Sequence, residues 1–297
     1  VDGDKIRFRK GLPQKIGGWT KFSQDYYVGV GRALEQWFAL NGSRYVAVGT
    51  DRKVYVYLGG DNQDITPIRE TATLVNAIST TTSSKILTIS DLNHGAKVGD
   101  FVTLSNVSAT VGGLTAATLD AEYQILSLAN VNAYTVESSG TANANAGPTA
   151  NCTASYQLNI GPSTQTFGYG WGASTWNTGT WGTPRSSSSV VLDTRLWSIN
   201  DWGEDLVITE KDGATYEWDT SAGMTNNRAT IVANAPTNST LSIVSTETRH
   251  VVCMGTETTI GNTGTQDKMF IRWSDQENYN QWTPNVTNSA GSQRIGG

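Results

Sequence analysis

Three stretches of the sequence share one pattern, and this repetition constrains the fold more than any other feature. Residues 45–59 read YVAVGTDRKVYVYLG, residues 205–219 read DLVITEKDGATYEWD, and residues 250–275 carry HVVCMGT and KMFIRWSD around a polar loop. Apolar and polar side chains alternate on both sides of a turn, which is the pattern of a β-hairpin. A strand and a turn are predicted just before each hairpin, at residues 37–44, 196–204 and 241–249.

The spacing of these repeats indicates an all-β fold built from blades. Leu206 and Val251 lie about 45 positions apart, which is close to the length of a propeller blade. We therefore predict a partial or complete set of β-propeller-like blades. Hairpins of this kind also occur in plain β-sandwiches, which remain the alternative fold.

A second module is predicted within the blades, because the first two repeats are separated by about 160 positions. Residues 71–160 are rich in Ala, Ser, Thr and Asn and contain no Trp, and strands are expected at 85–91, 100–106, 122–128, 133–138 and 154–161. This composition predicts an inserted small β-sandwich or barrel. The predicted domains are residues 1–70 (first blade part), 71–160 (insertion), 161–190 (Gly/Trp-rich arm) and 191–297 (further blades), in a chain expected to be a segment of a longer polypeptide.

The charge of the chain argues against nucleic acid as a tightly bound partner. The net charge is −5, and the only basic cluster consists of Lys5, Arg7, Arg9 and Lys10. Tight binding to DNA or RNA normally requires a concentrated basic face, so we do not expect it. The sequence also lacks an apolar run long enough to span a bilayer, so no membrane span is expected.

Few residues suggest catalysis, a cofactor or a metal. Two histidines, His94 and His250, are too few and too far apart for a histidine metal site, and structural roles are expected for both. Residues 62–66 (NQDIT) lack the acids of a calcium loop. Acidic residues near aromatic ones could supply the two carboxylates of a glycosidase, although hairpins carry such charges routinely: Glu204, Asp205, Glu210, Asp212, Glu217 and Asp219. We predict no catalytic, cofactor or metal residues and no enzymatic activity.

Three tryptophans in residues 167–185, Trp171, Trp176 and Trp181, are spaced by five among many glycines. In a continuous strand an odd spacing puts successive side chains on opposite faces, so these rings do not line one flat strand face. Three interpretations remain: burial within the chain, an arm that covers a neighbouring subunit, or sugar binding.

One structural cluster is predicted in residues 271–282 (IRWSDQENYNQW). Ile271 and Trp273 share a strand face, and Asp275 falls at a turn where its oxygens can accept backbone N–H bonds. Trp282 is expected to fold back onto Trp273 and close an aromatic cluster. The alternative is a ligand pocket formed by the two rings and Asp275.

Several phrases resemble structural tail proteins of short-tailed bacteriophages, most closely the tail nozzle, or tail tubular protein B-like, family. The phrases that resemble this family are residues 1–22, 41–69 and 271–295. Residues 92–136 resemble a β-module that is common in phage structural proteins. Residues 167–185 are similar to the Gly/aromatic tract that follows this module in such proteins. The resemblance covers most of the chain, although nozzles of that family are much longer than 297 residues.

The resemblance implies a specific role in the virion tail. Such a protein is built around β-propeller domains and forms a hexameric ring below the tail adaptor, in contact with tail fibre proteins. Genomic DNA passes through the ring during ejection without specific binding. Two other functions stay open: a host-surface module that binds glycan, and a tail-associated enzyme that degrades glycan.

Overall fold

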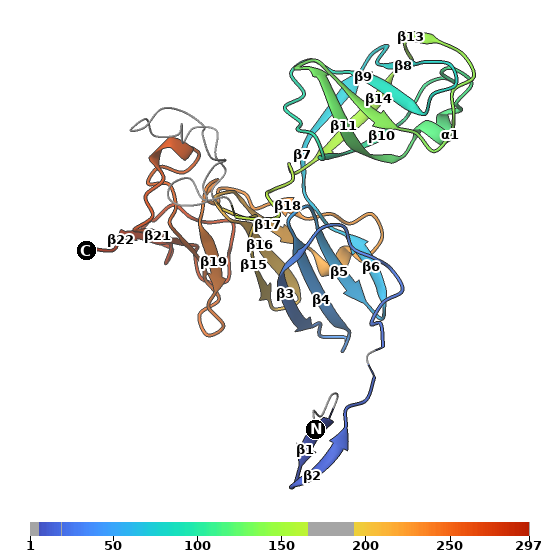
Figure 1. Ribbon diagram of the computed structural model, residues 1–297. Helices are drawn as coiled ribbons and strands as arrows, with labels where there is room; N and C mark the ends of the chain where they lie inside the picture. Colours follow the sequence, from blue (N-terminus) through green and yellow to red (C-terminus); the bar gives the residue numbers. More distant parts are fainter. Residues whose placement is uncertain (1–5, 19, 166–192, 297) are drawn as a thin grey trace, which may run out of the picture.

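The computed structural model describes residues 6–18, 20–165 and 193–296, and it shows an all-β protein (Figure 1). Its strands belong to a hairpin, to three four-stranded sheets and to one eight-stranded sheet. The hairpin consists of β1 (Ile6–Arg9) and β2 (Leu12–Lys15). Helical structure in the described residues is limited to α1 (Ala116–Leu119) and two short 3-10 turns, η2 (Thr220–Ala222) and η3 (Thr263–Thr265).

Three four-stranded sheets correspond to the three sequence repeats. The first sheet contains β3 (Gly31–Phe38), β4 (Arg44–Thr50), β5 (Val54–Leu58) and β6 (Asp61–Asp64). The second contains β15 (Trp197–Trp202), β16 (Asp205–Glu210), β17 (Thr215–Trp218) and β18 (Thr230–Ile231). The third contains β19 (Leu241–Val244), β20 (Val251–Met254), β21 (Phe270–Trp273) and β22 (Gly291–Arg294). Each sheet is an antiparallel meander in chain order.

Each predicted repeat lacked one of the strands that the structure contains. The sequence pattern indicated three strands per repeat, and the structure adds β6, β18 and β22 as a fourth strand in each sheet. These added strands have two to four residues; β18 and β22 expose most of their side chains, while β6 is mostly half-buried. A mostly exposed edge strand needs no alternation of apolar and polar residues, so it leaves little trace in the sequence.

The three sheets stack face to face. Leu206 and Ile208 of β16 pack with Val54 and Val56 of the first sheet in one core. Val207, which points to the opposite face of β16, packs with Val251 and Cys253 of the third sheet in another core. The first strands β3, β15 and β19 are neighbours in this stack, with β15 contacting both others. The described sheets thus form an open stack rather than a closed ring.

The far face of the third sheet is apolar and lies at the end of the stack. Register places six apolar residues on the face opposite Val251 and Cys253: Leu241, Ile243, Val252, Met254, Ile271 and Trp273. Leu241 and Ile243 are 40% and 47% exposed. The far face of the first sheet is instead partly covered by its own chain, since Phe22 and Tyr27 pack on Tyr57 and Tyr55.

The insertion is an eight-stranded antiparallel sheet with a separate core. Its strands are β7 (Ile68–Leu74), β8 (Ile78–Thr80), β9 (Ile86–Ser90), β10 (Phe101–Ser105), β11 (Glu122–Asn130), β12 (Ala133–Glu137), β13 (Ala146–Thr149) and β14 (Cys152–Gln157). Alternate residues of most strands point into one core, so the sheet curls around it. Bulges in β11 add to this curl. The chain enters the insertion through β7 and leaves it through β14, and these two strands pair.

The hairpin β1–β2 lies apart from the stacked sheets (Figure 1). Its turn residues Lys10 and Gly11 both have positive φ, 52° and 79°. A two-residue turn with positive φ at both positions is the type I′ turn, whose twist matches that of paired strands. The register is therefore fixed, with Phe8 opposite Pro13 and Arg9 opposite Leu12.

Candidate functional site

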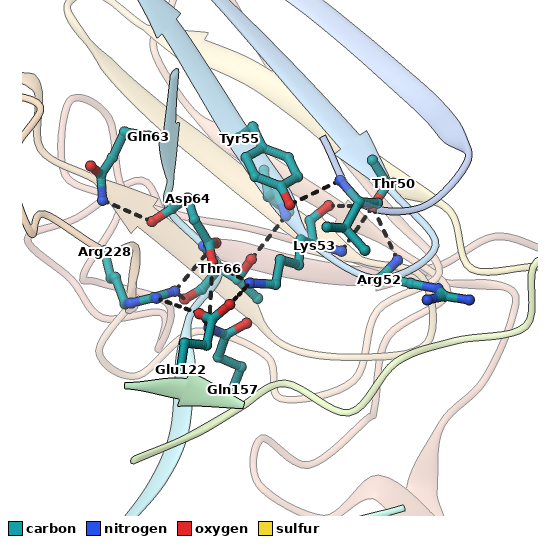
Figure 2. A network of polar contacts seen from close by, with 12 residues as sticks. Thr50, Arg52, Lys53, Tyr55, Gln63, Asp64, Thr66, Glu122, Gln157 and Arg228 are labelled. Carbon is teal, nitrogen blue, oxygen red and sulfur yellow. Dashed lines mark hydrogen bonds and ion pairs between the residues drawn. The ribbon is translucent and has the colours of Figure 1, made fainter. Parts of the chain in front are cut away.

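A network of polar side chains joins the insertion to the first two sheets, and its central residue is Lys53 (Figure 2). Lys53 follows β4 in a tight turn, where the Thr50 hydroxyl oxygen accepts the backbone N–H groups of Arg52 (3.1 Å) and Lys53 (2.8 Å). This turn directs the ammonium group inward, and the residue is only 3% exposed. The Lys53 Nζ lies 4.2 Å from the centre of the Phe101 ring in the insertion.

Asp64, the last residue of β6, is the first partner of Lys53. The distance from Lys53 Nζ to Asp64 Oδ2 is 2.8 Å, and that from Arg228 Nη1 to Asp64 Oδ1 is 3.2 Å. The Thr66 backbone N–H also donates to this carboxylate. Burial alone raises the pKa of the Asp64 carboxyl, but Lys53 and Arg228 outweigh burial and hold the pKa below its usual value.

Glu122, the first residue of β11, brings the insertion into the network. Its carboxylate pairs with Lys53 through Oε1 and lies 3.4 Å from Arg228 Nη2 through Oε2. Gln157, at the end of β14, donates from Nε2 to the carboxylates of both Glu122 and Asp64. Arg228 also donates to the Thr66 carbonyl, 3.0 Å away, so the second sheet is tied to the first.

The network is electrically balanced and occupies a junction of three modules. Two cations, Lys53 and Arg228, face two carboxylates, Asp64 and Glu122. Each charge is neutralised, so the group offers neither a free general base nor an unpaired cation for a ligand. Its physical effect is to fix how the insertion sits on the sheets, because movement would separate charges that are partly shielded from water.

The predicted Trp273–Asp275–Trp282 cluster was wrong in its pairing of the two rings. Trp282 is fully buried between the second and third sheets, in the core that contains Trp202, and its indole N–H donates to the Tyr279 carbonyl at 2.6 Å. Trp273 lies on the opposite face of the third sheet, where its cross-strand partners are Val252 and Gly291. Its indole N–H donates to the Ser289 carbonyl, 2.8 Å away.

Asp275 occupies a turn and organises backbone. Its Oδ1 atom accepts N–H bonds from Ser289 (2.8 Å) and Gln276 (2.9 Å). These bonds, the Ser289 bond first, lower the pKa of the Asp275 carboxyl. The structure therefore places Asp275 near the Trp273 ring through Ser289, and the Asp275 backbone N–H donates to the carbonyl of Gln281, the residue before Trp282, at 2.8 Å. The predicted Trp171, Trp176 and Trp181 lie outside the described residues.

The six acidic residues considered as a glycosidase pair are mostly engaged in local contacts. Glu204 accepts the Leu40 backbone N–H at 2.6 Å, and Asp205 and Asp219 accept those of Thr220 and Ser221. Glu210 pairs with Arg195 at 2.8 Å, and Asp212 pairs with Lys268. Glu217 lies beside the Tyr279 hydroxyl and raises its pKa, although burial raises it more.

The remaining candidates also have structural positions. The buried His94 accepts the Ala96 backbone N–H at its Nδ1 atom and packs on Tyr134, and His250 contacts the Ser289 hydroxyl. Cys152 and Cys253 are both buried and free. Among the described residues, no group of His, Cys, Asp or Glu is arranged to hold a metal ion. Helices of membrane-spanning length and hydropathy are absent from the same residues.

Comparison with known proteins gives little similarity. No protein-family model matches the chain, and no curated protein matches it. Among solved structures, a match to the phage phi92 endosialidase has a TM-score of 0.27 and 14% sequence identity, and covers 92% of this chain and 39% of that chain. This chain thus spans well under half of the length of that protein. At so low a TM-score the likeness supports no conclusion about fold or function.

Proposed function

We propose that the protein is a structural, non-enzymatic component of a bacteriophage tail, most like the nozzle ring through which DNA is ejected. The observation that carries the proposal is the face-to-face stack of three four-stranded meanders with β3, β15 and β19 adjacent. Consecutive blades of a propeller are stacked in this way. This architecture agrees with the sequence resemblance to nozzle proteins, in which blades surround a conduit.

Two further features support a role in an assembly. The acidic chain does not favour tight binding to the DNA that would pass through it. The apolar far face of the third sheet resembles the faces already buried within the stack, so it is suited to contact another protein surface. In the proposed virion tail the partners are further copies in a hexameric ring, the tail adaptor and tail fibre proteins.

Electron microscopy of the purified protein, alone and mixed with the tail adaptor, tests the proposal. We expect closed rings with six-fold symmetry and a central channel. A protein that remains monomeric under both conditions contradicts the ring. Turnover of capsular polysaccharide, lipopolysaccharide or peptidoglycan that one carboxylate substitution abolishes would favour the enzyme. Specific retention of a host glycan by the isolated insertion would favour the binding module.

A further inference from the structure

The hairpin β1–β2 has the properties of a docking element without a partner in the described chain. Phe8 and Leu12 are 78% and 70% exposed, and every residue of both strands is exposed. Its one side-chain hydrogen bond among the described residues, from Arg7 to Gln14, is internal to the hairpin. A two-stranded hairpin is marginally stable in water by itself, so apolar cover from elsewhere would stabilise it.

The hairpin is also strongly cationic. Residues 6–18 contain Arg7, Arg9, Lys10 and Lys15 and no acidic residue, in a chain whose net charge is −5. The register places Arg7, Arg9 and Leu12 on one face, while Ile6, Phe8 and Pro13 lie on the other. The arginine face therefore suits a partner surface that combines carboxylates with an exposed apolar side chain.

Such a surface exists where the first and second sheets meet. Glu204 lies in the β15–β16 turn, Asp205 is the first residue of β16, and Asp201 lies in β15. Glu204 accepts the backbone N–H of Leu40, whose side chain is 91% exposed. Glu35 of β3 is close enough to Asp201 for the two charges to repel. Acidic and apolar groups thus adjoin at one edge of the stack.

The electrostatics of this edge favour a cationic partner. Burial raises the pKa of the Asp205 carboxyl, and the neighbouring charges of Asp219 and Glu204 raise it further, while Arg249 offsets part of that effect. Burial and the charge of Asp201 likewise raise the pKa of Glu35. A guanidinium group placed beside these carboxylates would relieve their mutual repulsion.

We propose that the hairpin β1–β2 of one copy docks on the acidic edge of a second copy, with Leu12 against Leu40 and the arginines beside Asp201 and Glu204. A contact between two different patches is head-to-tail, and it builds rings or filaments according to the rotation between copies. The contact requires only self-association and does not depend on a role in a phage tail. Self-association through this contact without closed rings would therefore contradict the nozzle but not the docking.

Disulfide trapping tests which copy receives the hairpin. Two single variants, Leu12→Cys and Leu40→Cys, are mixed and oxidised, and the native Cys152 and Cys253 add little background because both are buried. We expect a covalent dimer in the mixture and none from either variant alone. A dimer from Leu12→Cys alone would show hairpin-to-hairpin pairing and overturn the proposal. So would an intramolecular bridge in the double variant with no dimer in the mixture, since the hairpin would then dock on its own chain.

Sedimentation velocity supplies a charge test with a matched control. Arg9→Glu is compared with Lys85→Glu, an equal change of charge at an exposed lysine of the insertion. We expect Arg9→Glu to weaken self-association at least about tenfold and Lys85→Glu to leave it unchanged. Added salt should weaken the native association as well. Equal effects of the two variants, or a native protein that is monomeric at every concentration, would overturn the proposal.

Discussion

The indole ring of Trp197 lies directly over Gly49, so a β-carbon on Gly49 would be 2.7 Å from the ring atom Cδ1. The Trp197 N–H also donates to the Thr50 carbonyl at 2.6 Å, which pins the second sheet to the first. The close approach of these two sheets therefore requires a residue without a side chain at position 49.

Gly49→Ala is expected to destabilise the protein by about 1–3 kcal/mol, because the ring must move in a packed core. Urea unfolding measures the loss. Gly147→Ala is the matched control, since no atom lies within 4 Å of the position of its added β-carbon. That control should change the free energy of unfolding by less than about 0.5 kcal/mol. Equal effects of the two substitutions would show that the sheets adapt to a methyl group at this contact.

Lys53→Met should cost about 3–5 kcal/mol of unfolding free energy, because it leaves Asp64 and Glu122 with one cation fewer in a poorly solvated place. The control is Lys268→Met, which removes a pair with Asp212 whose side chains are 57% and 41% exposed. An exposed pair contributes about 0–1 kcal/mol. Denaturant unfolding of both variants gives the comparison, and a Lys53→Met loss as small as the control would refute a structural role for the network.

The depressed pKa of Asp64 predicts how stability changes in acid. A carboxyl whose pKa is lower in the folded than in the unfolded state stabilises the fold fully above the unfolded value, and this contribution disappears as pH falls through the folded pKa. The free energy of unfolding, followed from about pH 5 to about pH 2, should fall less steeply for Asp64→Asn than for the native protein. Parallel curves would mean that Asp64 does not contribute to the acid response.

Trp282→Ala should cost about 3–5 kcal/mol, as expected for a fully buried large aromatic residue. Trp273→Ala should cost about 1–2 kcal/mol, since only part of its area is removed from water. The two residues lie on opposite faces of the third sheet, so the losses in the double variant should add within about 0.5 kcal/mol. A larger coupling between them would contradict the separation of the two rings.

Residues 68–157, expressed alone, should fold as a unit with one cooperative transition, because they have their own core and their first and last strands pair. Thermal unfolding followed by near-ultraviolet circular dichroism measures this. Leu104→Asp puts a charge at a position that is 1% exposed and should abolish the transition. If the unsubstituted fragment gave no near-ultraviolet signal, the insertion would depend on the sheets for its packing.

Local pattern predicted much of this fold, while contacts between modules were not predictable. The apolar residues of 54–58 and 206–208 identified strands correctly, because short apolar segments on either side of a polar turn are typical of paired strands. Alternation also put Trp273 and Ile271 on one face, but it could not say which face meets the second sheet. The register of Val251 and Cys253 decides that, and it separates Trp273 from Trp282.

The polar network shows the same limit. Lys53 lies in the polar turn of the first predicted hairpin, and nothing in that turn's sequence indicates that its side chain is buried. Asp64 belongs to residues 62–66, whose sequence indicates only that they lack the acids of a calcium loop. Its true partners lie 11 and 164 positions away, at Lys53 and Arg228, and only the tertiary fold brings them together. No spacing in the sequence signals such a group.

The pairing of β7 with β14 has a consequence for engineering. Both connections to the stack leave through two adjacent strands, with Ile68 opposite Gln157. A graft at this point needs only a foreign domain whose ends lie one strand spacing apart, about 5 Å. Replacing the insertion would remove Glu122 and Gln157, yet Lys53 would keep Asp64 as its counterion. The stack could then serve as a display scaffold whose cargo is exchanged without redesigning its blades.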